Sequence, residues 1–325
     1  MLIKRHSYGY FMQPIISIFV SLWLFTAGLS QTDSTRAPIL TPDSSLDSSL
    51  KTDTVAADTN SVDSDSTATS ADRRIEKKKP IPPQLTIKAF KVGEKLTFKI
   101  RYGFIKAGEA VMQVKDTLRM NGIPVYHLQT TARSVPAFDW IFKVRDEVNS
   151  YVTVNGFYSL RFEKKLREGG YKVDLIVDYN HEDSLAHVRF FRYDRDDKNQ
   201  DFKVKIPPYI NDILSSFYYV RNKTLKVGQS FYLQNHEKEK VYNLEIKIHR
   251  KETLEVDAGT FRCLVVEPML KGEGIFKQEG RLLVWLTDDE YKIPVQMTSE
   301  VLVGHITTEL IRMEGVPNPI PARLE

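Results

Sequence analysis

Apolar and polar residues alternate in successive runs along most of the chain after Lys95, and Gly, Asn, Asp or Pro interrupt the runs. A period of two places alternate side chains on opposite faces of a strand, which is typical of antiparallel sheet. Many strands in succession favour a meander that curls to protect its edges. The predicted strands span residues 96–102, 107–116, 124–132, 146–154, 156–166, 171–179, 184–193, 201–206, 230–236, 241–256, 260–268, 281–287, 295–303 and 305–313.

Tight turns are indicated between several of these strands. Asn121-Gly122, Asn155-Gly156 and Gly169-Gly170 lie where hairpins need residues that tolerate positive φ. The predicted fold is therefore all-β. We expect a single curved antiparallel sheet that forms an open or partly closed barrel, with one short helix packed near its mouth or in its concavity.

That helix is predicted over residues 210–221. Apolar residues recur at helical spacing after Pro207-Pro208, and Asn211 or Asp212 can cap the amides of the first turn. Arg221 in the last turn suits the negative end of the helix dipole. A second, weaker helical segment is indicated around residues 136–142, between two strands.

The first residues carry the features of a secretory signal peptide. Lys4 and Arg5 precede an apolar run over residues 15–29, and small residues follow up to position 30. We expect a periplasmic protein with no stable transmembrane segment; alternatively, the run stays uncleaved and tethers the domain to the inner membrane. Cys263 is the sole cysteine and lies far from this run, so a lipoprotein anchor is excluded and a buried strand thiol is expected.

The chain is predicted to divide into four parts. After the signal, Ser, Thr, Asp and Ala dominate, and such a segment buries too little apolar surface to fold. It ends in a basic, Pro-rich linker. The predicted parts are a signal peptide over residues 1–30, a disordered acidic tail over 31–83, one β-rich domain over 84–316 and a C-terminal tail over 317–325.

Charge gives a weak indication of partners. The whole chain has a formal net charge of +4, and the acidic tail leaves the predicted domain more basic than this value. Such an excess is ordinary for solubility, and it also suits anionic surfaces such as lipid headgroups. No nucleic acid, cofactor or metal is expected as a partner.

The sequence predicts no catalytic residue. Asp212, Ser215, Ser216 and Arg221 form a polar set on the predicted helix, but no local motif supplies a His to activate either serine. A nucleophilic serine needs such a base within hydrogen-bond reach. We therefore interpret these residues as capping and packing groups.

Three acidic or His-containing segments are interpreted as polar turns. Residues 194–199 lack the Gly of a calcium loop and place Lys198 where an oxygen ligand is required. Residues 181–183 have no spacing that directs two imidazoles to one ion. The adjacent carboxylates of residues 288–290 point apart, unlike the paired acids of a glycosidase.

Short motifs recur through the predicted domain. They are Gly93-Glu94-x-Leu96-x-Phe98, Tyr102-Gly103, Ala107-Gly108, residues 212–221, Ala258-Gly259-Thr260-Phe261 and residues 285–295. Together they resemble the bacterial "domain of unknown function 3108" family over about residues 85–315, most specifically at 215–221. The resemblance implies an exported envelope protein of a Gram-negative bacterium with a β fold similar to the open half-barrels of lipoprotein carriers. It implies no catalytic residue.

These observations favour a non-enzymatic binding or carrier protein for a lipid or other amphipathic envelope molecule. A continuous apolar cavity of at least roughly 300 Å³ beside the helix would favour this hypothesis. The alternative is an envelope scaffold that docks to a protein partner through an exposed strand edge or the acidic tail, and the third hypothesis is a hydrolase. The candidate ligand-binding residues are Phe217, Tyr218, Tyr219, Arg221, Trp140 and Trp285.

Overall fold

The computed structural model describes residues 81–270, 281–300 and 304–324. The predicted signal peptide and nearly all of the predicted acidic tail lie outside these residues. The end of the strand predicted over residues 295–303 also lies outside them.

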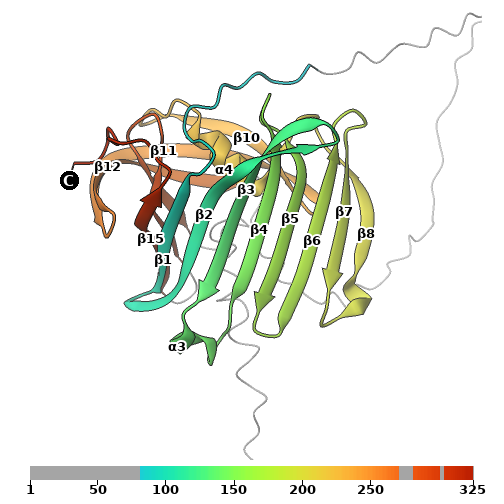
Figure 1. The fold of residues 1–325 in the computed structure, drawn as a ribbon, viewed down its shortest axis with the longest axis horizontal. Coiled ribbons are helices and arrows are strands. Elements are labelled where there is room, and N and C mark those ends of the chain that lie inside the picture. Colours follow the sequence, from blue (N-terminus) through green and yellow to red (C-terminus); the bar gives the residue numbers. More distant parts are fainter. Residues whose placement is uncertain (1–80, 271–280, 301–303, 325) are drawn as a thin grey trace, which may run out of the picture. The chain divides into compact units, whose positions relative to one another are not determined.

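Within the described residues, fifteen strands form one sheet (Figure 1). Neighbouring strands are antiparallel, except that the two-residue β9 pairs in parallel with β10. The strands are β1 (Lys95–Tyr102), β2 (Ile105–Met120), β3 (Ile123–Ser134), β4 (Arg145–Thr153), β5 (Ser159–Glu168), β6 (Tyr171–Asn180), β7 (Leu185–Arg192), β8 (Gln200–Lys205), β9 (Asn211–Asp212), β10 (Ser230–Glu237), β11 (Lys240–Val256), β12 (Gly259–Leu270), β13 (Leu282–Thr287), β14 (Pro294–Glu300) and β15 (His305–Glu314).

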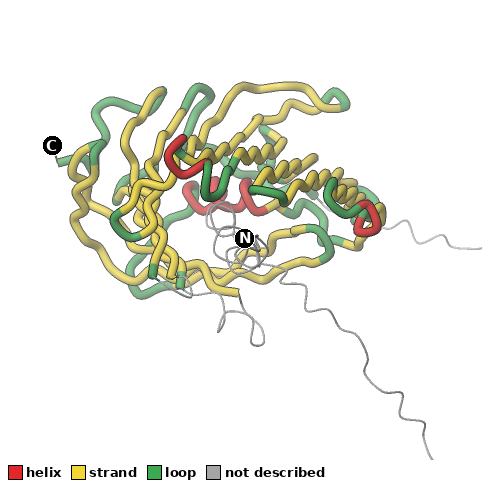
Figure 2. The backbone as a smooth tube through the Cα atoms, turned by 90° about the horizontal axis from the view of Figure 1, so that it is seen from below, coloured by secondary structure: helices red, strands yellow, loops and turns green. Residues whose placement is uncertain are grey.

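The sheet is open, and its two halves meet through the first and last strands. The strand order is β8-β7-β6-β5-β4-β3-β2-β1-β15-β14-β13-β12-β11-β10-β9. Because β1 pairs with both β2 and β15, the two ends of the strand series lie together in the middle of the sheet. The edges are therefore β8 and β9, and the sheet curls between them (Figure 2).

The predicted all-β fold with an open, curved sheet is confirmed. Each strand expected from alternation corresponds to a strand of the structure, with ends that differ by a few residues. The turns at Asn121-Gly122 and Gly169-Gly170 join β2 to β3 and β5 to β6, with positive φ at Asn121, Gly122 and Gly169. β9 was not predicted because two residues are too few to show a period.

Two α-helices interrupt the strands in the described part of the chain. Helix α4 (Ile213–Arg221) begins three residues later than predicted, because Asn211 and Asp212 pair with β10 instead. Helix α3 (Pro136–Asp139) is one turn within the segment expected to be helical, and a short 3-10 helix η1 (Asp196–Lys198) precedes β8. None of the described helices has the length and apolar character required to cross a bilayer.

Helix α4 lies on the inner face of the curled sheet and contacts both halves of it. The Ser159 amide of β5 donates to the Ile210 carbonyl at 3.2 Å, just before β9. On the other side, α4 packs against β10. The helix therefore lies where the interiors of the two halves meet, as predicted for the concavity.

The C-terminal residues pair with the edge of β12 near its start. The Arg262 amide donates to the Ala322 carbonyl at 2.9 Å, and Phe261 forms an isolated bridge with Arg323. The Cys263 side chain is fully buried, as expected. Burial raises the pKa of the Cys263 thiol to about 12, so it is unreactive at neutral pH.

Candidate functional site

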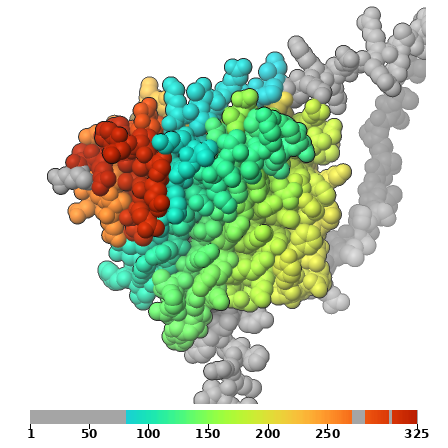
Figure 3. All heavy atoms as spheres, in the orientation of Figure 1, coloured from blue at the N-terminus to red at the C-terminus, as the bar shows by residue number. Residues whose placement is uncertain are grey.

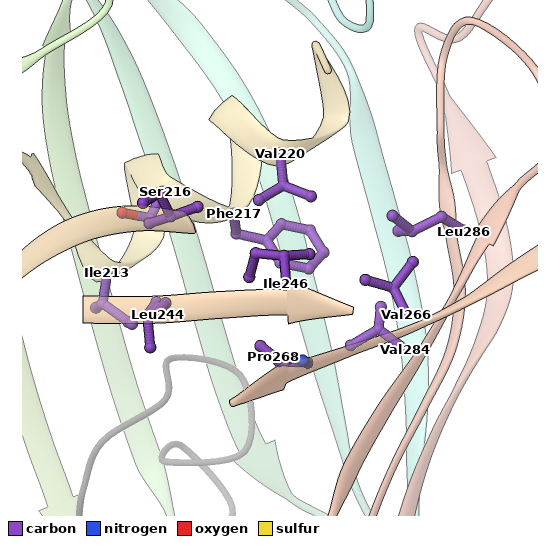
Figure 4. Close-up of a pocket in the computed structure, with 11 residues that line it drawn as sticks. Ile213, Ser216, Phe217, Val220, Leu244, Ile246, Val266, Pro268, Val284 and Leu286 are labelled. Carbon is purple, nitrogen blue, oxygen red and sulfur yellow. The ribbon is translucent and has the colours of Figure 1, made fainter. Parts of the chain in front are cut away.

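An apolar pocket lies beside α4 and is called the α4 pocket below (Figure 4). The helix supplies one wall, and the inner faces of β10 to β13 supply the other. Helical spacing places Ile213, Phe217 and Val220 on one side of α4, opposite alternate residues of the strands. The lining residues are Ile213, Ser216, Phe217, Val220, Leu233, Leu244, Ile246, Val266, Pro268, Val284 and Leu286.

The α4 pocket is open but narrow. Its volume is about 400 Å³ when the open mouth is counted, and ligand sites commonly measure roughly 300–1,000 Å³. The space left between the side chains holds only about two water molecules. The size expected of a carrier is thus reached only with the mouth included, and an acyl chain enters only if the walls separate.

One polar side chain belongs to the wall of the α4 pocket. Ser216 is buried, and its Oγ has no hydrogen-bond partner among the described residues. A buried hydroxyl without a partner is costly. Ser216 therefore offers one hydrogen bond to a polar atom of anything that fills the pocket.

A buried polar network holds the N-terminus of α4. The Asp212 carboxylate accepts hydrogen bonds from Ser150 Oγ at 2.5 Å, Ser159 Oγ at 2.6 Å and the Ser215 amide at 2.8 Å. Burial raises the pKa of the Asp212 carboxyl above its ordinary value. The predicted capping role of Asp212 is confirmed, and the network fastens α4 to β4 and β5.

The serines of this network hydrogen-bond to Asp212 and to each other. Ser215 Oγ donates to the Asp212 carbonyl and lies 2.9 Å from Ser159 Oγ. His181 is near, but its Nε2 donates to the Ser159 backbone carbonyl at 2.6 Å and its Nδ1 accepts from the Tyr209 amide. No His side chain of the described residues hydrogen-bonds a serine hydroxyl here, as a catalytic triad would require.

Arg221 is enclosed at the C-terminal end of α4. Its side chain is fully buried and forms a two-pronged ion pair with Glu94, the residue before β1, at 2.6 and 2.8 Å. The guanidinium also donates to the Ala89 and Tyr291 carbonyls. It lies 5.7 Å from the centre of the Phe90 ring. These contacts join three segments and leave Arg221 no access to a charged headgroup in this conformation.

The six candidate ligand-binding residues do not gather at one place. Phe217 lines the α4 pocket, whereas Tyr218 is buried against Phe90 with ring centres 4.9 Å apart. Tyr219 is half-buried, and the Lys223 ammonium lies over its ring in a cation–π contact. Trp285 lies on the outer face of β13, where its indole N–H donates to Glu252.

Trp140 lies elsewhere, in the loop after α3, and is 83% exposed. The sequence reasoning missed the strand residues that form most of the pocket wall, together with Ser216. Alternation in β11 to β13 identifies two faces on each strand, but it does not say which of them meets α4.

The acidic segments interpreted as polar turns have protein partners. Asp194 pairs with Arg192, and Asp197 pairs with Arg195, in the turn before β8. Asp289 Oδ1 accepts from the Tyr291 amide at 3.0 Å and closes the turn between β13 and β14. Among the residues that the structure describes, no group of three His, Cys, Asp or Glu side chains could hold a metal ion.

Comparison with known proteins identifies a family but no activity. The family model described as "Protein of unknown function (DUF3108)" matches residues 97–311. No curated protein sequence matches the chain significantly.

Several solved structures have low similarity to the chain. A β-barrel-like DUF1849 protein from Brucella abortus is 11% identical, with a TM-score of 0.47 over 71% of this chain and 100% of that chain. A protein from Bacteroides fragilis, described as exported with a YmcC-like fold, is 8% identical, with a TM-score of 0.32 over 72% and 99%. A protein from Parabacteroides distasonis, described as a lipoprotein, is 10% identical, with a TM-score of 0.32 over 71% and 99%.

Proposed function

The chain belongs to the DUF3108 family of proteins of unknown function, so its role has to be argued from its own site, and we propose that it binds lipids. In this proposal an exported, non-enzymatic protein takes the apolar chain of a lipid or other amphipathic envelope molecule into the α4 pocket. The lining of the α4 pocket is the observation that carries the proposal.

The pocket wall matches a hydrocarbon chain. Ten of its eleven lining residues are apolar, and they come from a helix and four strands whose inner rows converge. Contact with an apolar chain releases water from both surfaces, at about 25 cal/mol for each Å² buried. A sugar or a nucleotide would leave its polar groups without partners on this wall.

The narrow interior defines how binding proceeds. The wall side chains of β10 to β13 and α4 must move apart to admit a chain, and Phe217 is the largest of them. The carbonyl or hydroxyl of the ligand then reaches Ser216 Oγ, which has no other partner among the described residues. This geometry supports binding without reaction, because no base lies in hydrogen-bond contact with that serine.

Export supports a ligand from the cell envelope. Lys4 and Arg5 before the apolar run over residues 15–29 are typical of a signal peptide. A periplasmic protein meets lipids of both bacterial membranes and has to shield their chains from water. The proposed ligand class therefore follows from compartment and pocket together.

The test fills the pocket and measures the binding of cis-parinaric acid, a fluorescent fatty acid. In Val266→Phe the added ring occupies the space beside Phe217, so we expect at least tenfold weaker binding. Val227→Phe is the matched control, because Val227 is 46% exposed and outside the lining, and it should bind like the natural protein. Circular dichroism checks that both variants are folded. Equal affinity in both variants, or no saturable binding by the natural protein, contradicts the proposal.

Native mass spectrometry identifies the ligand. Protein purified from the periplasm of its own host should carry a co-purifying lipid mass, and Val266→Phe should carry less of it. Repeated preparations without any bound lipid would count against the proposal even if the fluorescent fatty acid binds.

A scaffold role is the second candidate, because β8 has a neighbouring strand on one side only. An exposed edge can accept a strand from a partner. Lys203 and Lys205 lie on this edge strand, and charged side chains, especially Lys, are a common protection against such pairing. The α4 pocket therefore supports binding better than β8 supports docking.

A further inference from the structure

Two neighbouring loops present large apolar side chains to solvent. Phe104 is 100% exposed and Ile105 60% exposed, between β1 and β2. Trp140 is 83% exposed and Ile141 48% exposed, after α3. These four residues are called the apolar rim below. Exposed apolar side chains that cluster commonly mark an interaction site.

The two loops are adjacent in space. The Val135 amide donates to the Ala107 carbonyl at 3.0 Å, and Gly108 is the register partner of Ser134. Ala107 and Phe138 also line the same small hollow. The α3 segment protrudes at the lower end of the sheet in Figure 3, on the same end as the β1–β2 turn in Figure 1.

The loop that carries Trp140 is held in place. Asp139 accepts hydrogen bonds from Arg145 Nη2 at 2.6 Å and from Ser134 Oγ. The Gly169 amide of the next turn donates to the Lys143 carbonyl at 2.8 Å. The apolar side chains are therefore displayed from a fastened base, and little further ordering is required on binding.

Basic residues surround the apolar rim. Exposed Lys106, Arg133 and Lys143 lie on the same two loops and their flanking strands. The nearby acids are already engaged, since Glu109 pairs with Lys106 and Asp139 pairs with Arg145. Glu109 also lies opposite Arg133 in the register, but Lys106, Arg133, Lys143 and Arg145 outnumber these two acids, so the two loops have a net positive charge.

From this juxtaposition we infer that the apolar rim docks on an anionic membrane, with Phe104 and Trp140 inserted at the level of the lipid headgroups. Aromatic rings favour the membrane interface, and adjacent Lys and Arg side chains gain from the surface charge of anionic lipids. Four side chains at protruding loops suit a soft lipid surface. A stable protein–protein interface buries roughly 800 Å² on each partner. That requires a larger and more closely fitted surface than these four side chains provide.

The apolar rim is remote from the α4 pocket along the strands. β5 approaches the α4 region at Ser159, through the Ile210 carbonyl, while its other end at Gly169 contacts the rim loop at Lys143. Docking is thus a property separate from ligand binding, and each can be lost without the other. A protein that has both can remain at a membrane while its pocket exchanges ligand.

Vesicle binding tests the inference on mature protein recovered from the host. Unilamellar vesicles of phosphatidylethanolamine and phosphatidylglycerol at 3:1 are compared with vesicles of phosphatidylcholine alone. The double variant Phe104→Ser with Trp140→Ser should bind the anionic vesicles at least tenfold less. Ile81→Ser is the matched control, because Ile81 is 83% exposed and outside the rim, and it should bind normally.

A charge variant separates the two contributions. Arg133→Ser with Lys143→Ser should weaken binding to the anionic vesicles several-fold and leave binding to phosphatidylcholine unchanged. Raising the salt concentration should have the same effect as this variant, because exposed charges are screened.

Tryptophan fluorescence reports the insertion directly. Trp140 is exposed whereas Trp285 is 7% exposed, so vesicles should shift the emission to shorter wavelength and brominated lipids should quench it. Equal vesicle binding by the natural protein and the rim double variant overturns the inference, as does emission that vesicles leave unchanged. Rim-dependent capture of a protein partner without vesicle binding also overturns it. Binding of cis-parinaric acid should be unaffected in every rim variant, which separates this test from that of the proposed function.

Discussion

The inner faces of the two halves of the sheet differ in their content of buried charged residues. In the half formed by β1 to β8, the inner face carries Asp146, Lys164 and Glu168, each less than 10% exposed. In the half formed by β10 to β13, the corresponding positions include Val266 and Val284 in the wall of the α4 pocket. One sheet thus encloses a partly charged interior and an apolar one.

The charged interior connects the halves. Lys164 of β5 pairs with Glu237 of β10, and Asp212 beside α4 accepts hydrogen bonds from Ser150 and Ser159. Such contacts are directional and hold the helix to the first half. Along the pocket, the second half touches α4 through apolar contacts alone. A ligand can replace these contacts. This difference indicates that the pocket opens at the wall formed by β10 to β13, while α4 stays attached to the first half.

The largest expected effect comes from removing the positive charge by which α4 pairs with Glu94, just before β1. Arg221→Met leaves Glu94 buried without its partner, so we expect a loss of about 3–5 kcal/mol in the free energy of unfolding. Urea denaturation measures it. Arg312→Met is the matched control, since its pair with Glu314 is exposed and should contribute at most about 1 kcal/mol.

A second variant distinguishes the cost of an unpaired charge from lost packing. The double variant Arg221→Met with Glu94→Leu should regain much of the stability, because it removes both charges. No recovery would mean that the hydrogen bonds of Arg221 to backbone carbonyls hold this junction, and not the pairing of charges.

The next effect is a pH dependence specific to the charged interior. Burial raises the pKa of Asp146 to about 7 and that of Glu168 to about 9, so the folded state binds more protons than the unfolded state between about pH 4 and about pH 9. Stability should therefore fall as pH rises toward 9, by at most about 1.4 kcal/mol per pH unit for each group.

Denaturation between pH 6.5 and 9 isolates this effect. Burial also lowers the pKa of His236 from its ordinary value to about 4, so His236 favours the unfolded state only in more acidic solution. Asp146→Asn with Glu168→Gln should flatten the decline. Asp201→Asn, at a side chain that is 70% exposed, should not. An unchanged slope in the double variant would mean that the two acids do not titrate within the folded domain.

The smallest effect comes from exchanging near-isosteric residues between the two interiors. Val266→Thr places a hydroxyl on the apolar wall and should cost about 1–3 kcal/mol. Thr130 is 4% exposed, and its Oγ1 has no partner among the described residues. Thr130→Val should therefore be neutral or stabilising, by up to about 1 kcal/mol.

Thermal denaturation of both variants checks this comparison. If Thr130→Val is clearly destabilising, the first interior is hydrated and its hydroxyls are satisfied by water. If Val266→Thr is neutral, the α4 pocket also contains water, and the contrast between the halves disappears.

The site was less predictable than the fold. Phe217, a candidate ligand-binding residue, lines the α4 pocket, but Arg221 was expected to face a ligand and is buried with Glu94. These residues are 127 positions apart, and no local pattern announces such a pairing. Trp140 and Trp285 were grouped by residue type, although one lies on an exposed loop and the other on an outer face.

The sequence by itself determined the strands, the helix and its cap. Alternation, turn dipeptides and capping residues act over a few positions, so the chain near each element is sufficient to specify it. Only the tertiary structure decided which faces meet. The pairing of β1 with β15 brings the two halves together, and the curl of the sheet places α4 between a charged interior and an apolar one. Those contacts depend on residues far apart in the sequence, and they create both the buried Arg221 and the α4 pocket.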